Sequence, residues 1–269
     1  MKINRFKYSL KDIKIFADYY KNNHTLLETA KYFNINYKTM INSFIRLGYY
    51  KPTRKQLNRK YTILHEDYFS KIDSHEKAYF LGLLMSDGYI ATDTYSKIMG
   101  ITLQLQDEYI LEYLKQAINP NSKLHYYKNS VKFRINSTKI YNDLKTLNFS
   151  ESKSNKEFHI PNINKEFYNS FIAGYFDGDG CITLKKSGYT VCSIISNSKL
   201  ILEDIQKILT DNNILTTLRI DRPAKNNRQA LYILAINRLK EQKKFGEFIY
   251  KNTPIYLIRK KEKFMQIPC

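Results

Sequence analysis

The stretch SFIAGYFDGDGCI, residues 170–182, is apolar as far as Phe176 and then becomes acidic and rich in glycine. A second stretch with the same design, AYFLGLLMSDGYI, occupies residues 78–90. Each reads as an apolar helix that ends on carboxylates among glycines. The recurrence matters, because a single Ser-Asp-Gly after an apolar helix would be an ordinary capped turn.

Both stretches carry small residues four positions apart, namely Gly82 with Ser86 and Gly174 with Gly178. Residues four apart lie on one face of a helix, and a face of small residues lets two helix backbones approach closely. If the two helices pack side by side through these faces, their C-terminal ends meet at one point.

Each helix is expected to end on an acid, Asp87 or Asp179, followed by Gly88 or Gly180. We expect the glycines to adopt positive φ and to turn the chain into a strand. Two carboxylates held together repel, and the partial negative charge of a helix C-terminus adds to that repulsion. A divalent cation would offset it, and Mg²⁺ with oxygen ligands and a bound water suits phosphodiester hydrolysis.

The charge of the chain favours a polyanionic partner. Its 269 residues include 44 Lys and Arg against 25 Asp and Glu, a net charge of +19. Nucleic acid is the first expectation and an anionic membrane surface the second. Apolar runs are too short for a membrane span, and no secretory signal is visible. Three scattered cysteines, Cys181, Cys192 and Cys269, exclude a zinc cluster and suit a reducing compartment.

Residues 1–50 are predicted to form a separate module that resembles a helix-turn-helix. Three short helical patterns occur there, with a capping box at Thr25 and Glu28 and a left-handed residue at Asn34. Gly48 is expected to close the third helix. The simpler alternative is a three-helix packing module that does not contact DNA.

The two faces of this module differ in character. The residues expected to face inward are Ala30, Ile35, Met40 and Phe44. The residues expected to contact DNA from the outer face of the third helix are Tyr37, Lys38, Asn42 and Arg46.

From residue 75 onward the chain repeats itself once, and we predict an α+β fold of two pseudo-symmetric αββαββα repeats. RINSTK at 134–139 corresponds to AINRLK at 235–240. The expected helices are 76–86, 108–118, 137–147, 166–178, 198–211 and 238–250, and the expected strands lie near 89–106, 123–135, 181–196, 214–222 and 230–236. The predicted boundaries are 1–50 for the first module, 51–74 for a basic linker, and 75–160 and 161–269 for the repeats.

FLGLLMSDG (80–88) and IAGYFDGDG (172–180) resemble the two signature motifs of the LAGLIDADG homing endonucleases. The resemblance covers about residues 75–262, in the single-chain, two-repeat form of the family. The first motif departs from the family pattern at Met85 and Ser86. The resemblance implies that the acid before each final glycine, Asp87 or Asp179, binds the metal, whereas Asp177 matches a variable position and is expected to be structural.

The resemblance also implies a saddle of two four-stranded sheets along the DNA major groove. Alternation in ITLQLQ agrees, because Ile101, Leu103 and Leu105 are expected to face inward. The alternative is an ordinary solvated sheet face. The residues expected to contact DNA from the sheets are Thr102, Gln104, Lys132, Arg134, Lys185, Thr217 and Arg219.

Further catalytic groups are implied by the resemblance alone, because the family uses basic or amide side chains beside its metals. Lys153, in SESKSN after the first repeat, is one candidate, and Lys260, in YLIRKKEKF after the second, is its partner. Arg259 is a less favoured alternative to Lys260. Gln106 and Asn197 close equivalent strands and are expected to hold waters near the metals.

Taken with the paired acids and the positive charge, the resemblance implies a site-specific endonuclease that hydrolyses both strands of DNA at a long, asymmetric target with Mg²⁺ or Mn²⁺. We expect a monomer with double-stranded DNA as its partner and no membrane association. It would lie in the cytoplasm of a bacterial or phage-infected cell, or in an organelle matrix. Two alternatives stay open: a non-catalytic DNA-binding regulator of the same fold, and an RNA maturase that binds intron RNA.

Overall fold

The computed structural model describes residues 8–22, 24, 26–50, 65–93, 96–151, 157–184, 190–225 and 228–267. The chain divides into two compact units, Met1–Thr62 and Ile63–Cys269, and each is described by itself. Within the described ranges, the helices are too short or too polar for any of them to cross a membrane.

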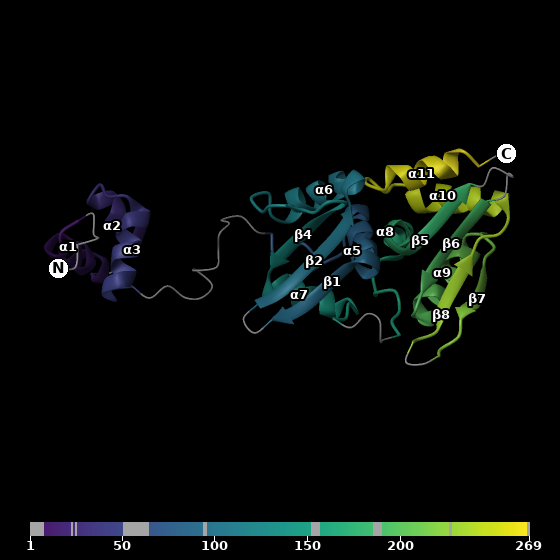
Figure 1. Ribbon diagram of the computed structural model, residues 1–269, viewed down its shortest axis with the longest axis horizontal. Helices are drawn as coiled ribbons and strands as arrows, with labels where there is room; N and C mark the ends of the chain where they lie inside the picture. The colour runs from purple at the N-terminus through teal and green to yellow at the C-terminus, as the bar shows by residue number, and fades with distance from the viewer. Residues whose placement is uncertain are drawn as a thin grey trace. The chain divides into compact units, whose positions relative to one another are not determined.

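Within its described residues, the first unit has three helices: α1 (Leu10–Lys21), α2 (Leu26–Tyr32) and α3 (Tyr37–Leu47) (Figure 1). Ser9 caps α1 in a capping box with Asp12, an arrangement that satisfies backbone N–H groups at the start of the helix. The small core of the first unit is formed by buried side chains from all three helices: Ile13, Phe16, Ala17, Ala30, Met40 and Phe44.

The turn chemistry predicted for this unit is confirmed where it is described. Asn34 has φ of 49° and Gly48 has φ of 75°, so both adopt the left-handed conformation expected of them. Ile35 is half-buried against the small core. The predicted capping residue Thr25 lies outside the described residues, as does the basic segment 51–64.

The second unit has the predicted αββαββα order twice (Figure 1). The first repeat contains α5 (His75–Asp87), β1 (Gly88–Asp93), β2 (Ser96–Gln104), α6 (Glu108–Ile118), β3 (His125–Tyr126), β4 (Ser130–Asn136) and α7 (Thr138–Thr146). The second contains α8 (Tyr168–Asp179), β5 (Gly180–Leu184), β6 (Thr190–Ser196), α9 (Lys199–Asp211), β7 (Thr217–Arg222), β8 (Leu231–Ala235) and α10 (Leu239–Tyr250). A final helix, α11 (Ile258–Met265), was not predicted.

The two sheets have the same topology, and the first three strands in each strand order pair in the same register. Each is antiparallel and four-stranded, in the orders β1-β2-β4-β3 and β5-β6-β8-β7. Ile101 pairs with Gly88 and Phe133, and Ile194 pairs with Gly180 and Leu234. The register therefore makes Phe133 and Leu234 equivalent, which confirms the correspondence of RINSTK with AINRLK.

The motif helices α5 and α8 lie side by side between the two sheets (Figure 1). An added Cβ on Gly82 would lie 2.0 Å from the carbonyl oxygen of Phe171, and one on Gly174 would lie 1.9 Å from that of Tyr79. Both distances are far below van der Waals contact. The small-residue faces are therefore where the two helix backbones meet, as predicted.

Gly174→Ala is expected to destabilise the second unit by about 1–3 kcal/mol or more, because the new methyl group can only be accommodated by separating two backbones. Thermal unfolding of the variant and of the wild type measures this. Gly178→Ala probes the same helix contact nearer its end: its Cβ would lie 1.9 Å from the Ser86 hydroxyl oxygen and 2.5 Å from the Ser86 Cβ, which rotation of that side chain does not move. A loss of stability is therefore expected there as well. Equal melting temperatures for Gly174→Ala and wild type would contradict the close approach.

Three predictions about this unit are wrong. Gly88 and Gly180 have φ of −81° and −82°, not positive values. They are required instead because a Cβ would lie 2.6 Å from the Leu84 side chain at Gly88, and 2.4 Å from the Phe176 carbonyl oxygen at Gly180. Leu105 is 43% exposed rather than inward-facing.

The reason for the exposure of Leu105 is that β2 ends at Gln104 and Leu105 begins a 3-10 turn, Leu105–Asp107.

The third correction concerns the predicted linker 51–74. Tyr68, Phe69 and Ile72 are buried in the core of the second unit. This unit therefore begins before the predicted residue 75.

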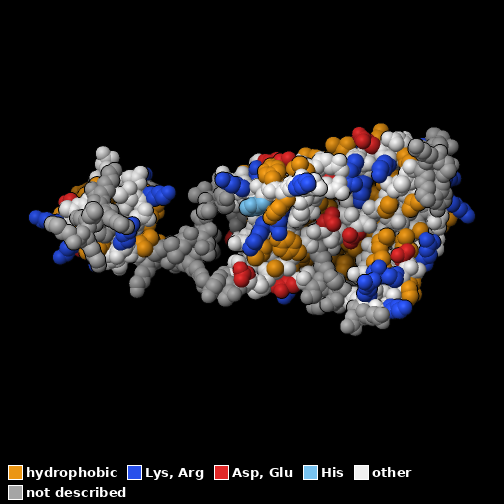
Figure 2. Space-filling model, in the orientation of Figure 1, with side chains coloured by type: hydrophobic (Ala, Val, Ile, Leu, Met, Phe, Trp, Pro, Cys, Tyr) orange, Lys and Arg blue, Asp and Glu red, His pale blue; other side chains and the backbone are white. Residues whose placement is uncertain are grey.

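Helices cover one face of each sheet: α6 and α7 pack on the first sheet and α9 packs on the second. At the end of β2, buried and exposed side chains alternate: Ile101 and Leu103 are buried, and Thr102 and Gln104 are exposed. In the second unit, basic side chains gather over both halves of the face in Figure 2, and acidic side chains also lie between the halves.

Candidate active site

The two motif acids are the last residues of the paired helices. Asp87 ends α5 and Asp179 ends α8, and both side chains are exposed. A Cβ on Gly178, the neighbour of Asp179 in the chain, would lie 3.2 Å from Asp87 Oδ2. The carboxylate of one helix therefore lies against the end of the other, as the small-residue faces predicted.

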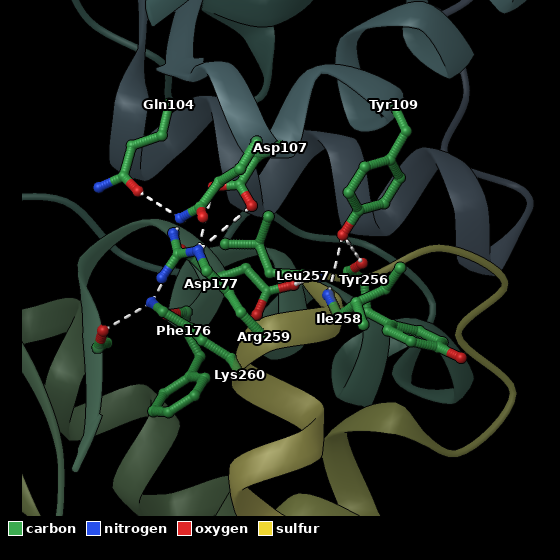
Figure 3. A network of polar contacts seen from close by, with 12 residues as sticks. Gln104, Asp107, Tyr109, Phe176, Asp177, Tyr256, Leu257, Ile258, Arg259 and Lys260 are labelled. Atoms are coloured by element: carbon green, nitrogen blue, oxygen red, sulfur yellow. Dashed lines mark hydrogen bonds and ion pairs between the residues drawn. The ribbon is translucent and has the colours of Figure 1, made fainter. Parts of the chain in front are cut away.

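Lys260 holds the end of α8. Its Nζ donates to the carbonyl oxygens of Phe176 (2.7 Å), Asp177 (2.8 Å) and Gly180 (2.6 Å) (Figure 3). A lysine ammonium has three N–H donors, and all three are engaged here. Burial lowers the pKa of Lys260 to about 8. The nearby Asp177 carboxylate acts in the opposite direction and raises this pKa. Cations at a helix C-terminus also oppose its partial negative charge.

The family resemblance implies that Lys260 is a catalytic group beside the metals. The observed bonds give this side chain a different task, because they fix the backbone on both sides of Asp179. Its predicted partner Lys153 lies outside the described residues. Arg259, the less favoured candidate, is bound to a carboxylate of the first repeat, Asp107.

Asp177 is completely buried and bridges several elements. Its oxygens accept from the hydroxyl groups of Tyr79 (2.9 Å) and Tyr250 (2.7 Å) and from the backbone N–H of Leu257 (2.7 Å). Burial raises its pKa to about 6, although these hydrogen bonds oppose that rise. The geometry agrees with the structural role expected of Asp177.

The sheet register identifies which polar residues occupy equivalent positions beside the acids. Asn197 is exposed and follows Ile194, the partner of Gly180, by three residues. The residue three beyond Ile101, the partner of Gly88, is Gln104. Gln106, predicted as the equivalent of Asn197, lies in the following turn and donates to Gln104 Oε1 at 2.7 Å. Gln104 is therefore the counterpart of Asn197.

Most residues predicted to contact DNA from the sheets are exposed. Thr102 and Arg134 lie on the first sheet, and Thr217 and Arg219 on β7. Lys132 is half-buried, with its Nζ 4.8 Å from the centre of the Tyr89 ring. Lys185 lies outside the described residues. In the first unit, all four residues of α3 that were expected to contact DNA are exposed, namely Tyr37, Lys38, Asn42 and Arg46.

Tyr89 is a residue of this face that sequence reasoning missed. A Cβ on Gly100 would lie 2.5 Å from the Tyr89 ring, so the ring covers the position where Gly100 has no side chain. Tyr89 is the second residue after Asp87 and pairs with Gly100 across β1 and β2. The available signal was a tyrosine directly after the Asp-Gly of the motif.

The comparisons with known proteins agree with this geometry. Residues 166–250 match a family model described as a LAGLIDADG-like domain. The matched residues run from just before the motif helix α8 to the end of α10 in the second repeat. The first repeat has the same element order, the same strand order and an equivalent motif helix.

Solved structures of homing endonucleases resemble the second unit. The I-LtrWI LAGLIDADG homing endonuclease, solved bound to target DNA, has a TM-score of 0.50 and 14% identity, covering 76% of this chain and 90% of that one. Mesophilic variants of the homing endonuclease I-DmoI give a TM-score of 0.49 and 19% identity, covering 72% of this chain and 95% of that one. On the comparison with I-LtrWI, the second unit has the LAGLIDADG homing endonuclease fold.

Two curated relatives match part of the chain. The ribonucleoside-diphosphate reductase NrdEB alpha subunits of Bacillus subtilis (strain 168) and of Bacillus phage SPbeta are each 22% identical over 170 residues. The matches cover 57% of this chain, which spans only 16% of the length of either relative.

Proposed function

We propose that this protein is a site-specific endonuclease that cleaves both strands of double-stranded DNA with a divalent metal ion. The observation that carries the proposal is the meeting of Asp87 and Asp179 at the ends of two tightly packed helices, between two sheets. The sheets present polar and cationic side chains on the face that helices leave open. Both acids come from one chain, so we propose that the active form is a monomer.

The donor atoms at the helix ends fit Mg²⁺ or Mn²⁺. Among the described residues, no three His, Cys, Asp or Glu side chains are grouped so that they could hold an ion by themselves. Mg²⁺ usually keeps several waters and binds through one or two carboxylates together with substrate phosphates. Asp87 and Asp179 supply that pair, and bound DNA would complete the coordination. Such an ion polarises the phosphate and lowers the pKa of a bound water.

The residues of the chain itself have separable tasks in this proposal. Asp87 and Asp179 hold the ion, while Lys260 fixes the backbone around Asp179. The exposed amides of Gln104 and Asn197 occupy equivalent positions and would orient water or phosphate oxygen. The strand register places Gln104, and not Gln106, at the position equivalent to Asn197. Gln104 is therefore the first-repeat candidate for orienting water or phosphate oxygen.

Target recognition is proposed to come from the open face of the sheets. Arginine can donate two hydrogen bonds to guanine in the major groove, and threonine can contact the thymine methyl group. Arg134 and Thr102 offer these groups on the first sheet, and Arg219 and Thr217 offer them on the second. Equivalent positions of the two sheets nevertheless carry different side chains, since Thr102 corresponds in register to Ile195, and this difference favours an asymmetric target.

We also propose that the first unit extends the target through α3. Removing residues 1–62 is expected to leave a folded protein, because the described core of the second unit begins at Tyr68. The shortened protein should cut the same central site but protect fewer base pairs. Its log–log salt slope should fall by about 0.9 for each phosphate that the first unit neutralises. Identical footprints and slopes would show that this unit only packs and does not bind DNA.

The proposed function is tested by incubating the protein with a randomised DNA duplex library and Mg²⁺, and by sequencing the cut ends. The expected result is a single family of sites cut on both strands, with no cutting in the presence of EDTA. Selective retention of one sequence without any cutting would favour the non-catalytic regulator. Cutting with no preferred sequence would contradict the proposed specificity.

A further inference from the structure

An ion pair between the buried Asp107 carboxylate and the partly exposed Arg259 guanidinium joins the two repeats beside the candidate site. Asp107 is 2% exposed, and its carboxylate accepts from Arg259 Nε (3.2 and 3.1 Å) and Nη2 (2.9 Å). Asp107 occupies the N-cap position of α6 but makes no side-chain capping bond there. Its carboxylate is committed to Arg259 instead, which lies in α11 at the other end of the second unit's sequence (Figure 3).

The chain around Arg259 is held from both sides. On the first-repeat side, the Tyr109 hydroxyl donates to the carbonyl oxygen of Tyr256 (2.9 Å) and accepts from the backbone N–H of Ile258 (2.8 Å). On the second-repeat side, Leu257 binds Asp177 and Lys260 binds the end of α8. Residues 256–260 therefore connect the two halves of the candidate site (Figure 3).

In the second repeat, a carboxylate from the segment between the repeats holds the equivalent stretch of chain. If Gln104 corresponds to Asn197, then Asp107 corresponds to Leu200. The backbone N–H of Leu200 donates to Glu157 Oε2 at 3.1 Å, and the Ser198 hydroxyl donates to the same oxygen at 3.0 Å. Glu157 lies in the segment after the first repeat, as Arg259 lies in the segment after the second.

We propose that Arg259 and Asp107 are positioning residues for one half of the DNA-cleaving centre, and that Glu157 has the same task for the other half. The ion pair holds the turn Leu105–Asp107, which directly follows Gln104 and carries the Gln106 amide that binds it. Each tie controls the placement of one of the equivalent amides, Gln104 or Asn197. This inference rests on the proposed function.

The geometry explains why arginine is needed in the first tie. A guanidinium presents several donors in a planar fork and can engage both carboxylate oxygens at once, whereas a lysine ammonium is a compact point charge. Lysine at position 259 would keep the charge but lose the fixed orientation. Arg259→Lys therefore tests positioning while a positive charge stays beside the buried Asp107 carboxylate.

The experiment measures cutting of each strand separately, on a supercoiled plasmid that carries the target selected from the library. Wild type should convert the plasmid to the linear form with little nicked intermediate. Arg259→Lys and Asp107→Asn should each slow cutting of one and the same strand by about tenfold, a modest change in barrier. Glu157→Gln should slow the other strand, and the exposed Arg238→Lys is the matched control.

Hydrogen exchange gives a readout that does not depend on activity. In Arg259→Lys, exchange should become faster in residues 103–108 while the melting temperature stays close to that of Arg238→Lys. Unchanged exchange together with a wild-type ratio of the two strand rates would overturn the positioning role. Slowing of both strands equally would also overturn it. A wild-type protein that binds DNA but cuts neither strand would instead overturn the proposed function, and the strand assignment with it.

Discussion

Cleavage of a target duplex is expected to fall about 100-fold or more when either Asp87 or Asp179 is replaced by asparagine, because a metal ion supplies several kcal/mol of charge stabilisation. The substitution keeps the size of the side chain and removes one anionic ligand. Since both acids are exposed at helix ends, neither change should unfold the protein. Cleavage rates with saturating protein and Mg²⁺ measure the effect.

Binding is the control for these two variants. The acids hold the proposed metal and do not lie on the strands, so affinity for the target without metal should stay close to that of wild type or increase slightly. Replacing an acid near DNA phosphates removes repulsion. If Asp87→Asn and Asp179→Asn both cut at the wild-type rate, these carboxylates do not form the cleaving centre.

Lys260→Met is expected to lower the free energy of unfolding by about 2–4 kcal/mol, because carbonyl oxygens of Phe176, Asp177 and Gly180 lose a buried charged donor. Methionine retains much of the volume, so the loss reports on the hydrogen bonds rather than on a cavity. Denaturant unfolding measures it. Asp177 also loses a nearby positive charge, which adds to the cost.

The exposed Lys240→Met is the matched control, and it should change stability by less than about 0.5 kcal/mol. Cleavage by Lys260→Met should fall as well, even at temperatures where the variant is fully folded, since the end of α8 is no longer fixed. A variant as stable as Lys240→Met would contradict the buried capping role of Lys260.

The parts of the structure that sequence could predict depend on local patterns. Small residues four apart in two apolar helices predicted the contact of α5 with α8, and strand alternation predicted the exposed side chains of β2 as far as Gln104. Asn34 and Gly48 show the same success for turns, since their conformations follow from a local requirement for positive φ.

The parts that could not be predicted depend on contacts between distant segments. Gly88 and Gly180 follow helices, where positive φ is common, but only the packed structure shows that each is needed because the preceding turn leaves no space for a Cβ. Lys260 and Asp107 are ordinary charged residues in sequence. Their burial and partners come from the return of residues 256–260 to both repeats.

The site itself was predicted in part for the same reason. The acids belong to a short motif, so Asp87 and Asp179 could be identified directly. The equivalence of Gln104 with Asn197 depends on strand register, and counting from the ends of the predicted strands gave Gln106 instead. A single extra turn, Leu105–Asp107, accounts for the difference.

The most direct test of the account is metal-directed cleavage of the protein backbone. Fe²⁺ replaces Mg²⁺ in the complex of the full chain with its target duplex, and ascorbate with peroxide generates radicals at the bound ion. Mass spectrometry of the fragments should show breaks beside both Asp87 and Asp179, which are suppressed by excess Mg²⁺ and absent in the Asp87→Asn, Asp179→Asn double variant. Breaks beside only one of these acids, or elsewhere in the chain, would contradict the claim that the paired helices deliver both carboxylates to one metal-dependent centre.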